Sequence, residues 1–128
     1  MPDLDFALLL DRWNAAAPDE CERFETRSGA LASYILPSIG LEVGIDGAFD
    51  AADAALVLGA VKACAAARGL DMDTKVRTRR GESAATVLLM PTARATGASQ
   101  SQSTSRGPAA LLALAHASLS AYLDAIGA

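Results

Sequence analysis

Two alternating segments on either side of one glycine constrain the fold more than any other feature of this sequence. In residues 74–80, uncharged and basic side chains alternate, which is the two-residue period of a β-strand with two different faces. Residues 83–90 form a second, more apolar segment, and Pro91 ends it. Gly81 lies between the two and can adopt the positive φ that a tight turn requires. The pattern predicts an antiparallel β-hairpin.

Three further segments, upstream of the hairpin, have the composition of strands. The clearest is the last of them, in which aliphatic residues alternate with two glycines and Glu42, so that one face is apolar. Pro37 separates it from an earlier apolar segment, and the charged segment after Cys21 alternates more weakly. The predicted strands are residues 21–27, 30–36 and 39–45.

Three segments have the signals of helices. Asp3 and Asp50 can cap the first two, Gly69 ends the second, and Pro108 takes the favoured first position of the third. The predicted helices are residues 3–15, 50–68 and 108–126.

The elements predict one α+β domain that spans residues 1–128, in the order α-β-β-β-α-β-β-α. A chain of this length has room for one core, and 52% hydrophobic residues are enough to build it. An antiparallel sheet packed against helices, in two layers, is the natural arrangement for this order. Residues 92–107 are rich in Ser, Thr and Gln and predict a long polar loop, either functional or mobile.

The charge of the chain argues against a general nucleic-acid-binding protein, since the formal net charge is -4 and the sequence pI is about 4.8. No apolar run reaches the roughly 18 residues of a membrane span, so we expect no contact with a membrane. Asp3 and Asp5, without a basic stretch beside them, argue against a secretory signal. We therefore expect a cytoplasmic protein whose cysteines are reduced.

No constellation of residues predicts catalysis or metal binding. Cys21 and Cys64 belong to no Cys-X-X-Cys pair or Cys/His cluster, so the ligand set for a metal is missing. The single histidine, His116, lies in a leucine stripe of the last helix, which favours a core or interface position over a general base. The carboxylates of Asp71 and Asp73 follow the second helix, where acidic residues commonly flank turns. We predict a protein that is not an enzyme and uses no cofactor.

Positive charge is concentrated in one part of the chain. Residues 1–73 contain 13 acidic and 5 basic side chains, whereas residues 74–107 contain six basic side chains and only Glu82 as an acid. Guanidinium groups bind phosphate and carboxylate in bidentate fashion, so this region predicts an anion site. A solvated edge strand, or a strand that pairs with the acidic N-terminal half of a second subunit, explains the same charges. The candidate anion-binding residues are Lys75, Arg77, Arg79, Arg80, Arg94 and Arg106.

The second and third helices are apolar over more than half of their circumference, and the second is rich in alanine. Helices of this kind are buried on several sides. In so small a domain, this indicates burial against another subunit or a partner protein, or simply a composition rich in alanine.

The order of the elements, the length and the acidity resemble those of the dimeric type III secretion chaperones of the CesT/SycE kind. Generic local matches are Phe6-Ala7-Leu8-Leu9-Leu10 in the first helix, Leu41-Glu42-Val43 in a strand, and the leucine-rich last helix. The resemblance implies a cytoplasmic homodimer that binds an extended segment of a secreted effector protein by strand addition and pocket filling.

The resemblance also implies which residues take part. The middle helix and the strand after it form the subunit interface in such a dimer, here Val57, Val61, Cys64 and Val76. The first helix and the first three strands offer grooves to the partner segment, here through Leu8, Trp13, Tyr34, Leu41 and Val43. We therefore predict a non-enzymatic, chaperone-like homodimer. The alternative is a small regulatory or inhibitor protein that binds an anion or nucleotide through the basic hairpin.

Overall fold

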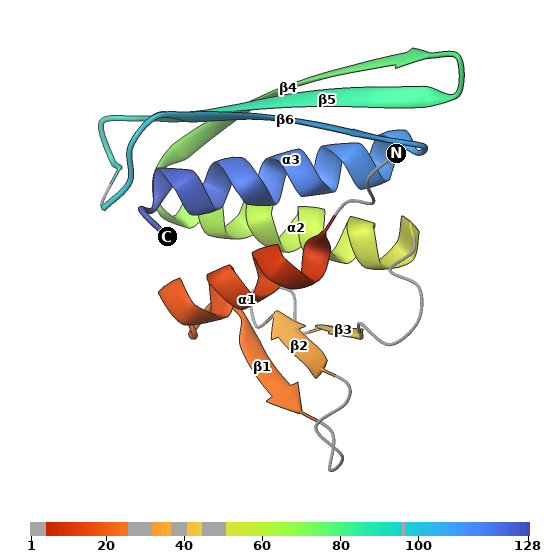
Figure 1. The fold of residues 1–128 in the computed structure, drawn as a ribbon. Coiled ribbons are helices and arrows are strands. Elements are labelled where there is room, and N and C mark those ends of the chain that lie inside the picture. Colours follow the sequence, from red (N-terminus) through yellow and green to blue (C-terminus); the bar gives the residue numbers. More distant parts are fainter. Residues whose placement is uncertain (1–4, 26–31, 37–40, 45–50, 96) are drawn as a thin grey trace.

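The structure is a computed structural model, in which residues 5–25, 32–36, 41–44, 51–95 and 97–128 are described. Its strands form two antiparallel sheets, with the orders β1-β2-β3 and β4-β5-β6. Figure 1 shows the second sheet above the helices and the first, smaller sheet below them. The helices are α1 (Phe6–Ala16), α2 (Ala51–Ala67) and α3 (Ala110–Ala125). The strands are β1 (Glu22–Glu25), β2 (Ala32–Leu36), β3 (Leu41–Gly44), β4 (Leu70–Arg79), β5 (Glu82–Pro91) and β6 (Ser101–Gly107).

The α+β class is confirmed, as is the packing of antiparallel sheets against helices. All eight predicted elements are present in the predicted order. Some predicted boundaries differ from those in the structure; for example, β4 begins at Leu70 rather than at residue 74. The expected helix caps Asp3 and Asp50 lie outside the described residues. Asp5 caps α1 instead, since its Oδ1 accepts the N–H of Leu8 at 2.9 Å.

One correction concerns the predicted polar loop at residues 92–107, whose last seven residues form strand β6. Every second residue of β6 points toward α3, but these residues are serines, so the strand has no apolar face to reveal it. The Ser101 hydroxyl donates to the Ala121 carbonyl, and that of Ser103 donates to Ser120 at 2.9 Å. Ser105 lies 2.6 Å from Nδ1 of His116. Three side-chain hydrogen bonds thus attach β6 to α3.

The core lies between the β4-β5-β6 sheet and the helices. On β5 the buried residues alternate, and Ala85, Val87 and Leu89 are fully covered. Helix α3 packs against this sheet on one side and against α1 and α2 on the other. This central position explains why α3 is apolar around most of its circumference: its apolar faces are covered within one chain. Helix α2 turns Val57 and Val61 toward the core and leaves an alanine-rich face exposed.

A two-residue turn joins β4 to β5, since Arg79 pairs with Glu82. Both central residues have positive φ, 53° at Arg80 and 76° at Gly81, which is the signature of a type I′ turn. The prediction of a hairpin centred on Gly81 is therefore confirmed, and the turn fixes the register of its two strands. In Figure 1 the tip of this hairpin extends past the end of α3.

Candidate binding surfaces on the β4-β5-β6 sheet

Strand β4 is an edge strand with little cover. Within the described sheet it pairs with β5 alone. Leu70 is buried and Met72 half-buried, but every residue of the segment 73–79 is exposed. Val76 lies opposite the buried Ala85 and so faces the helix side of the sheet, yet it is 40% exposed. The second half of β4 therefore presents a free hydrogen-bonding edge and an uncovered apolar side chain.

The charges on the outer face of β4 change sign halfway along the strand. Alternation places two acids and then three bases on this face, at spacings of about 7 Å. None of the five has an ion-pair partner among the residues that the structure describes. In order along the strand they are Asp71, Asp73, Lys75, Arg77 and Arg79.

A groove of about 330 Å³ lies between the end of α2 and the start of β4. Its apolar lining includes Leu70 and Met72 from the strand, with small alanine side chains from the helix. The alanines leave room beside the strand, and the only charged residues of the lining are Lys62 and Asp71. The lining residues are Lys62, Ala65, Ala66, Leu70, Asp71, Met72 and Thr74.

A second hollow, of about 390 Å³, lies on the outer face near the hairpin tip and is lined mainly by arginines. Arg77 on β4 and Arg106 on β6 flank Ala84 on β5 in a single cross-strand row. Because Ala84 has only a methyl side chain, the row is low at its centre. The lining residues are Arg77, Arg79, Arg80, Glu82, Ala84 and Arg106.

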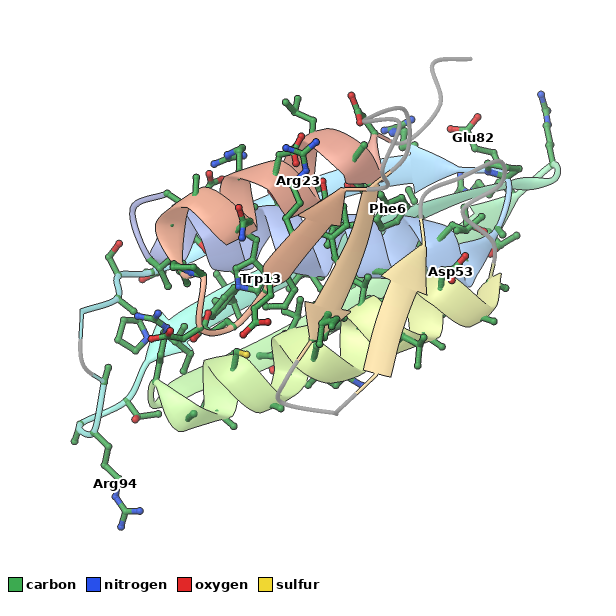
Figure 2. All side chains as sticks on the ribbon, turned by 90° about the horizontal axis from the view of Figure 1, so that it is seen from below. Phe6, Trp13, Arg23, Asp53, Glu82 and Arg94 are labelled. Atoms are coloured by element: carbon green, nitrogen blue, oxygen red, sulfur yellow. The ribbon has the colours of Figure 1, made fainter. Side chains whose placement is uncertain are left out.

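Of the six predicted anion-binding residues, the structure brings four together in this hollow. Lys75 lies on the same face, two residues before Arg77, and does not line it. Arg94 is in the turn after β5 and lies at the opposite end of the molecule from Glu82, as Figure 2 shows. The grouping of Arg106 with the hairpin arginines depends on strand β6, which the sequence alone did not predict.

Of the four residues expected at a dimer interface, three are buried in the single chain and one is exposed. Val57 and Val61 are 0% exposed and Cys64 is 5% exposed, so all three belong to the core of the single chain. Val76 alone is exposed. Leu70, Met72 and the two acids between and after them were not among the predicted site residues, although apolar and acidic residues alternate there as in a strand.

Among the residues expected to bind a partner segment, one is exposed and two are buried in the described structure. Leu8 is 58% exposed on α1, whereas Trp13 and Tyr34 are buried. The Tyr34 hydroxyl donates a short hydrogen bond to the Asp11 carboxylate, and burial together with this bond raises the pKa of the phenol. The side chains of Leu41 and Val43 lie outside the described part of the structure.

Trp13 instead takes part in a polar network around Glu20 that joins the three helices. The Trp13 indole and the Tyr122 hydroxyl donate to Oε1 of Glu20, at 3.0 and 2.6 Å. Arg68 lies 3.2 Å from Oε2 of the same carboxylate, and its Nε donates to the Tyr122 oxygen at 2.7 Å. Burial and the neighbouring Glu20 raise the pKa of Tyr122. The network satisfies its polar groups internally, which is the pattern of a structural site.

The groups with the most reactive chemistry are also enclosed. Burial lowers the pKa of His116, and the Phe6 ring packs edge-on against the imidazole at 5.3 Å. Burial raises the pKa of Cys21 to about 12, so this thiol is neutral at pH 7. In the described ranges, no group of three or more His, Cys, Asp or Glu could hold a metal ion. None of the helices in the described part of the chain is long and apolar enough to cross a membrane.

No protein-family model matches this chain, and comparisons with curated proteins and with solved structures give no match either. In the described part of the chain, the free edge of β4 and the arginine-lined hollow both present unpaired polar groups to solvent, and a function has to be argued from these surfaces.

Proposed function

We propose that this chain is a non-enzymatic, chaperone-like protein-binding protein that forms a homodimer by pairing β4 of one subunit with β4 of the other. The observation that carries the proposal is the charge order of β4, with two acids followed by three bases on one exposed face. A strand with this order is complementary to itself when the second copy runs antiparallel. An antiparallel self-pairing is also what a two-fold symmetric dimer requires.

The charges select a register. With the two-fold axis at Thr74, Asp73 lies opposite Lys75 of the partner subunit, and Asp71 lies opposite Arg77 of the partner subunit. Symmetry repeats each pair, and each cross-strand pair of opposite charge contributes about 0.2–1 kcal/mol. Moving the axis to Lys75 would place this lysine opposite its own copy, which is unfavourable. The axis at Thr74 therefore leaves no like charges opposed.

The same register matches the apolar residues on the inner face. Met72 lies opposite Val76 of the partner subunit, and Leu70 lies opposite Thr78 of the partner subunit. The partner's Val76 would thus meet the groove between α2 and β4, whose lining includes Leu70 and Met72. Pairing would cover the 40% of Val76 that is exposed and satisfy the edge of β4, giving a continuous six-stranded sheet.

A charge exchange tests this pairing. Asp73→Lys or Lys75→Asp alone opposes like charges at two symmetric positions, and we expect each to weaken the dimer by at least about tenfold. The double variant D73K/K75D restores opposite charges at both positions and should restore the dimer. Asp19→Lys is the matched control, since Asp19 is an exposed acid in the turn after α1.

The measurement is size-exclusion chromatography with light scattering over a range of concentrations. A dimeric wild type, weakened singles and a restored double variant would support the proposal. A monomeric wild type at every concentration would overturn it, as would a double variant that is no stronger than the singles.

The chaperone-like part of the proposal, binding of an extended segment of another cytoplasmic protein, is directed to α1 and the β1-β2-β3 sheet. It is supported by the resemblance in element order and by Leu8, which is 58% exposed on α1. A photo-crosslinking residue at position 8 in the native host should capture one defined segment of one protein. The same residue at Asp19 should not; equal capture at both positions would overturn this part.

A further inference from the structure

We infer that the arginine-lined hollow at the tip of the β4-β5 hairpin binds a polyphosphate group, a function beyond the dimerisation proposed above. The hollow brings four guanidinium groups from three elements of the chain around one small side chain, Ala84. Arg77 comes from β4, Arg106 from β6 and Arg80 from the turn. Arg79 lies next to the turn, opposite Glu82 in the backbone register, and Glu82 is the only acid among the described lining residues.

These guanidinium groups are free to bind a ligand. None of the four has an ion-pair or side-chain hydrogen-bond partner within the described residues. Four positive charges against the single carboxylate of Glu82 leave an excess of three. Concentrated like charge on one face is unfavourable unless an anion neutralises it. Within the described residues, this excess of positive charge is not neutralised by the chain itself.

The position of Arg80 is a second, independent observation. The first central position of a type I′ turn strongly favours Asn, Asp or Gly, because the side chain must tolerate positive φ. Arg80 occupies it with a φ of 53°, a conformation that is unfavourable for a residue with a long side chain. The turn is therefore less stable than it would be with asparagine, and the substitution that relieves the strain also removes a charge from the hollow.

The chemistry of the lining selects the class of ligand. Guanidinium forks bind phosphate oxygens in bidentate fashion, and a triphosphate carries enough negative charge to neutralise the excess. Among the described residues, the lining contains no aromatic side chain on which a nucleobase could stack. The hollow therefore recognises the phosphates and not the base, so inorganic triphosphate and nucleoside triphosphates bind with similar affinity.

The hollow shares Arg77 with the dimer contact, because Arg77 lies opposite Asp71 of the partner subunit in the proposed register, but its other three arginines take no part in that contact. In the register proposed above, residues 70–78 pair across the two-fold axis, and Arg79, Arg80 and Arg106 lie beyond them. Charge reversal at Asp73 therefore leaves these three residues in place, and substitution of Arg106 leaves the edge of β4 in place. Failure of one proposal does not imply failure of the other.

Isothermal titration calorimetry with inorganic triphosphate, ATP, GTP and adenosine tests the site at constant ionic strength. We expect triphosphate, ATP and GTP to bind within a few-fold of one another, and adenosine not to bind. Arg106→Ala and Arg79→Ala should each weaken triphosphate binding by about tenfold. Arg94→Ala, the same substitution at the opposite end of the molecule, should leave binding unchanged.

Arg80→Asn gives two readouts of opposite sign. Thermal unfolding should occur at a higher temperature, because asparagine suits the turn, while triphosphate binding should weaken. No triphosphate binding to the wild type at millimolar concentration would overturn the inference. So would equal effects of R106A and R94A, or an R80N variant that binds as well as the wild type. Much tighter binding of one nucleotide than of triphosphate would overturn the assignment to polyphosphate alone.

Discussion

The two edges of the β4-β5-β6 sheet differ in what covers them. Both edge strands pair with β5, but the serines of β6 are hydrogen-bonded to α3, and Ser105 is buried. On β4, the residues from 73 to 79 are exposed on both faces, and Val76 lies uncovered on the helix side. One edge is attached to its own chain, whereas the inner face of the other is left uncovered.

Whether an edge strand is open to a further strand depends on what covers its inner face. An edge that is protected by charge alone commonly has lysines or inward-pointing charges. Strand β4 has charges on its outer face, but in an order complementary to itself, and its inner face has Met72 beside an open groove. Protection against any partner needs neither feature, and both are what the proposed self-pairing would use.

The largest expected effect comes from placing a charge on the inner face of β4. Val76→Glu puts two carboxylates against the apolar grooves of the dimer, so we expect its dissociation constant to rise on the order of 100-fold. The fold of the monomer should be unchanged, since Val76 is 40% exposed in it. Analytical ultracentrifugation measures the association, with Thr86→Glu, a substitution on the outer face of the central strand, as the control.

A pair of hydroxyl deletions compares the two edges in the monomer. Ser105→Ala leaves the half-buried His116 without its 2.6 Å partner, and we expect a loss of about 1–2 kcal/mol in the free energy of unfolding. Thr74→Ala removes a hydroxyl from the exposed half of β4 and should cost no more than about 0.5 kcal/mol. Urea unfolding of both variants measures the two losses in the free energy of unfolding. Equal losses would contradict the difference between the edges.

A smaller effect should appear with pH at the β6 edge, through His116. Burial lowers the pKa of His116 in the folded chain, against a weaker opposing effect of Asp5. The unfolded chain therefore binds a proton at His116 more readily than the folded chain. The contribution of the neutral imidazole to the free energy of unfolding is fully present above pH 6.5 and is lost as the pH falls through the folded pKa. Urea unfolding between pH 8 and pH 5 should show this loss. His116→Gln should remove that part of the pH dependence, and an unchanged dependence in this variant would assign it to other groups.

The parts of the fold that could be predicted are those in which the pattern of side chains repeats the geometry. The hairpin is one, because alternation and Gly81 specify both strands and their turn. Strand β6 could not be predicted in this way, since its inward-facing residues are serines whose role depends on hydrogen bonds to α3. A repeat of apolar residues indicates the buried face of a strand only where the buried side chains are apolar.

The candidate site could be predicted only in part, for a related reason. Val57 and Val61 lie on an apolar stripe, and a stripe does not reveal whether its own chain or another chain covers it; here its own chain does. Arg106 joins Arg77 only through the register of β5 with β6. The position of Asp71 and Asp73 after the second helix favours acids that flank a turn, whereas the structure places both in β4, where they alternate with Leu70 and Met72.

Disulfide cross-linking at the proposed two-fold axis tests the central claim, self-pairing of β4, most directly. In the proposed register Thr74 lies opposite its own copy, at the Cα separation of about 4.5–5.5 Å that a disulfide can span. Thr74→Cys should therefore form a covalent dimer under mild oxidation, and an equal mixture of Asp73→Cys and Lys75→Cys subunits should link while neither does alone. The native cysteines are buried and should not contribute. No link at position 74, or a link of Lys75→Cys with itself, would contradict the account.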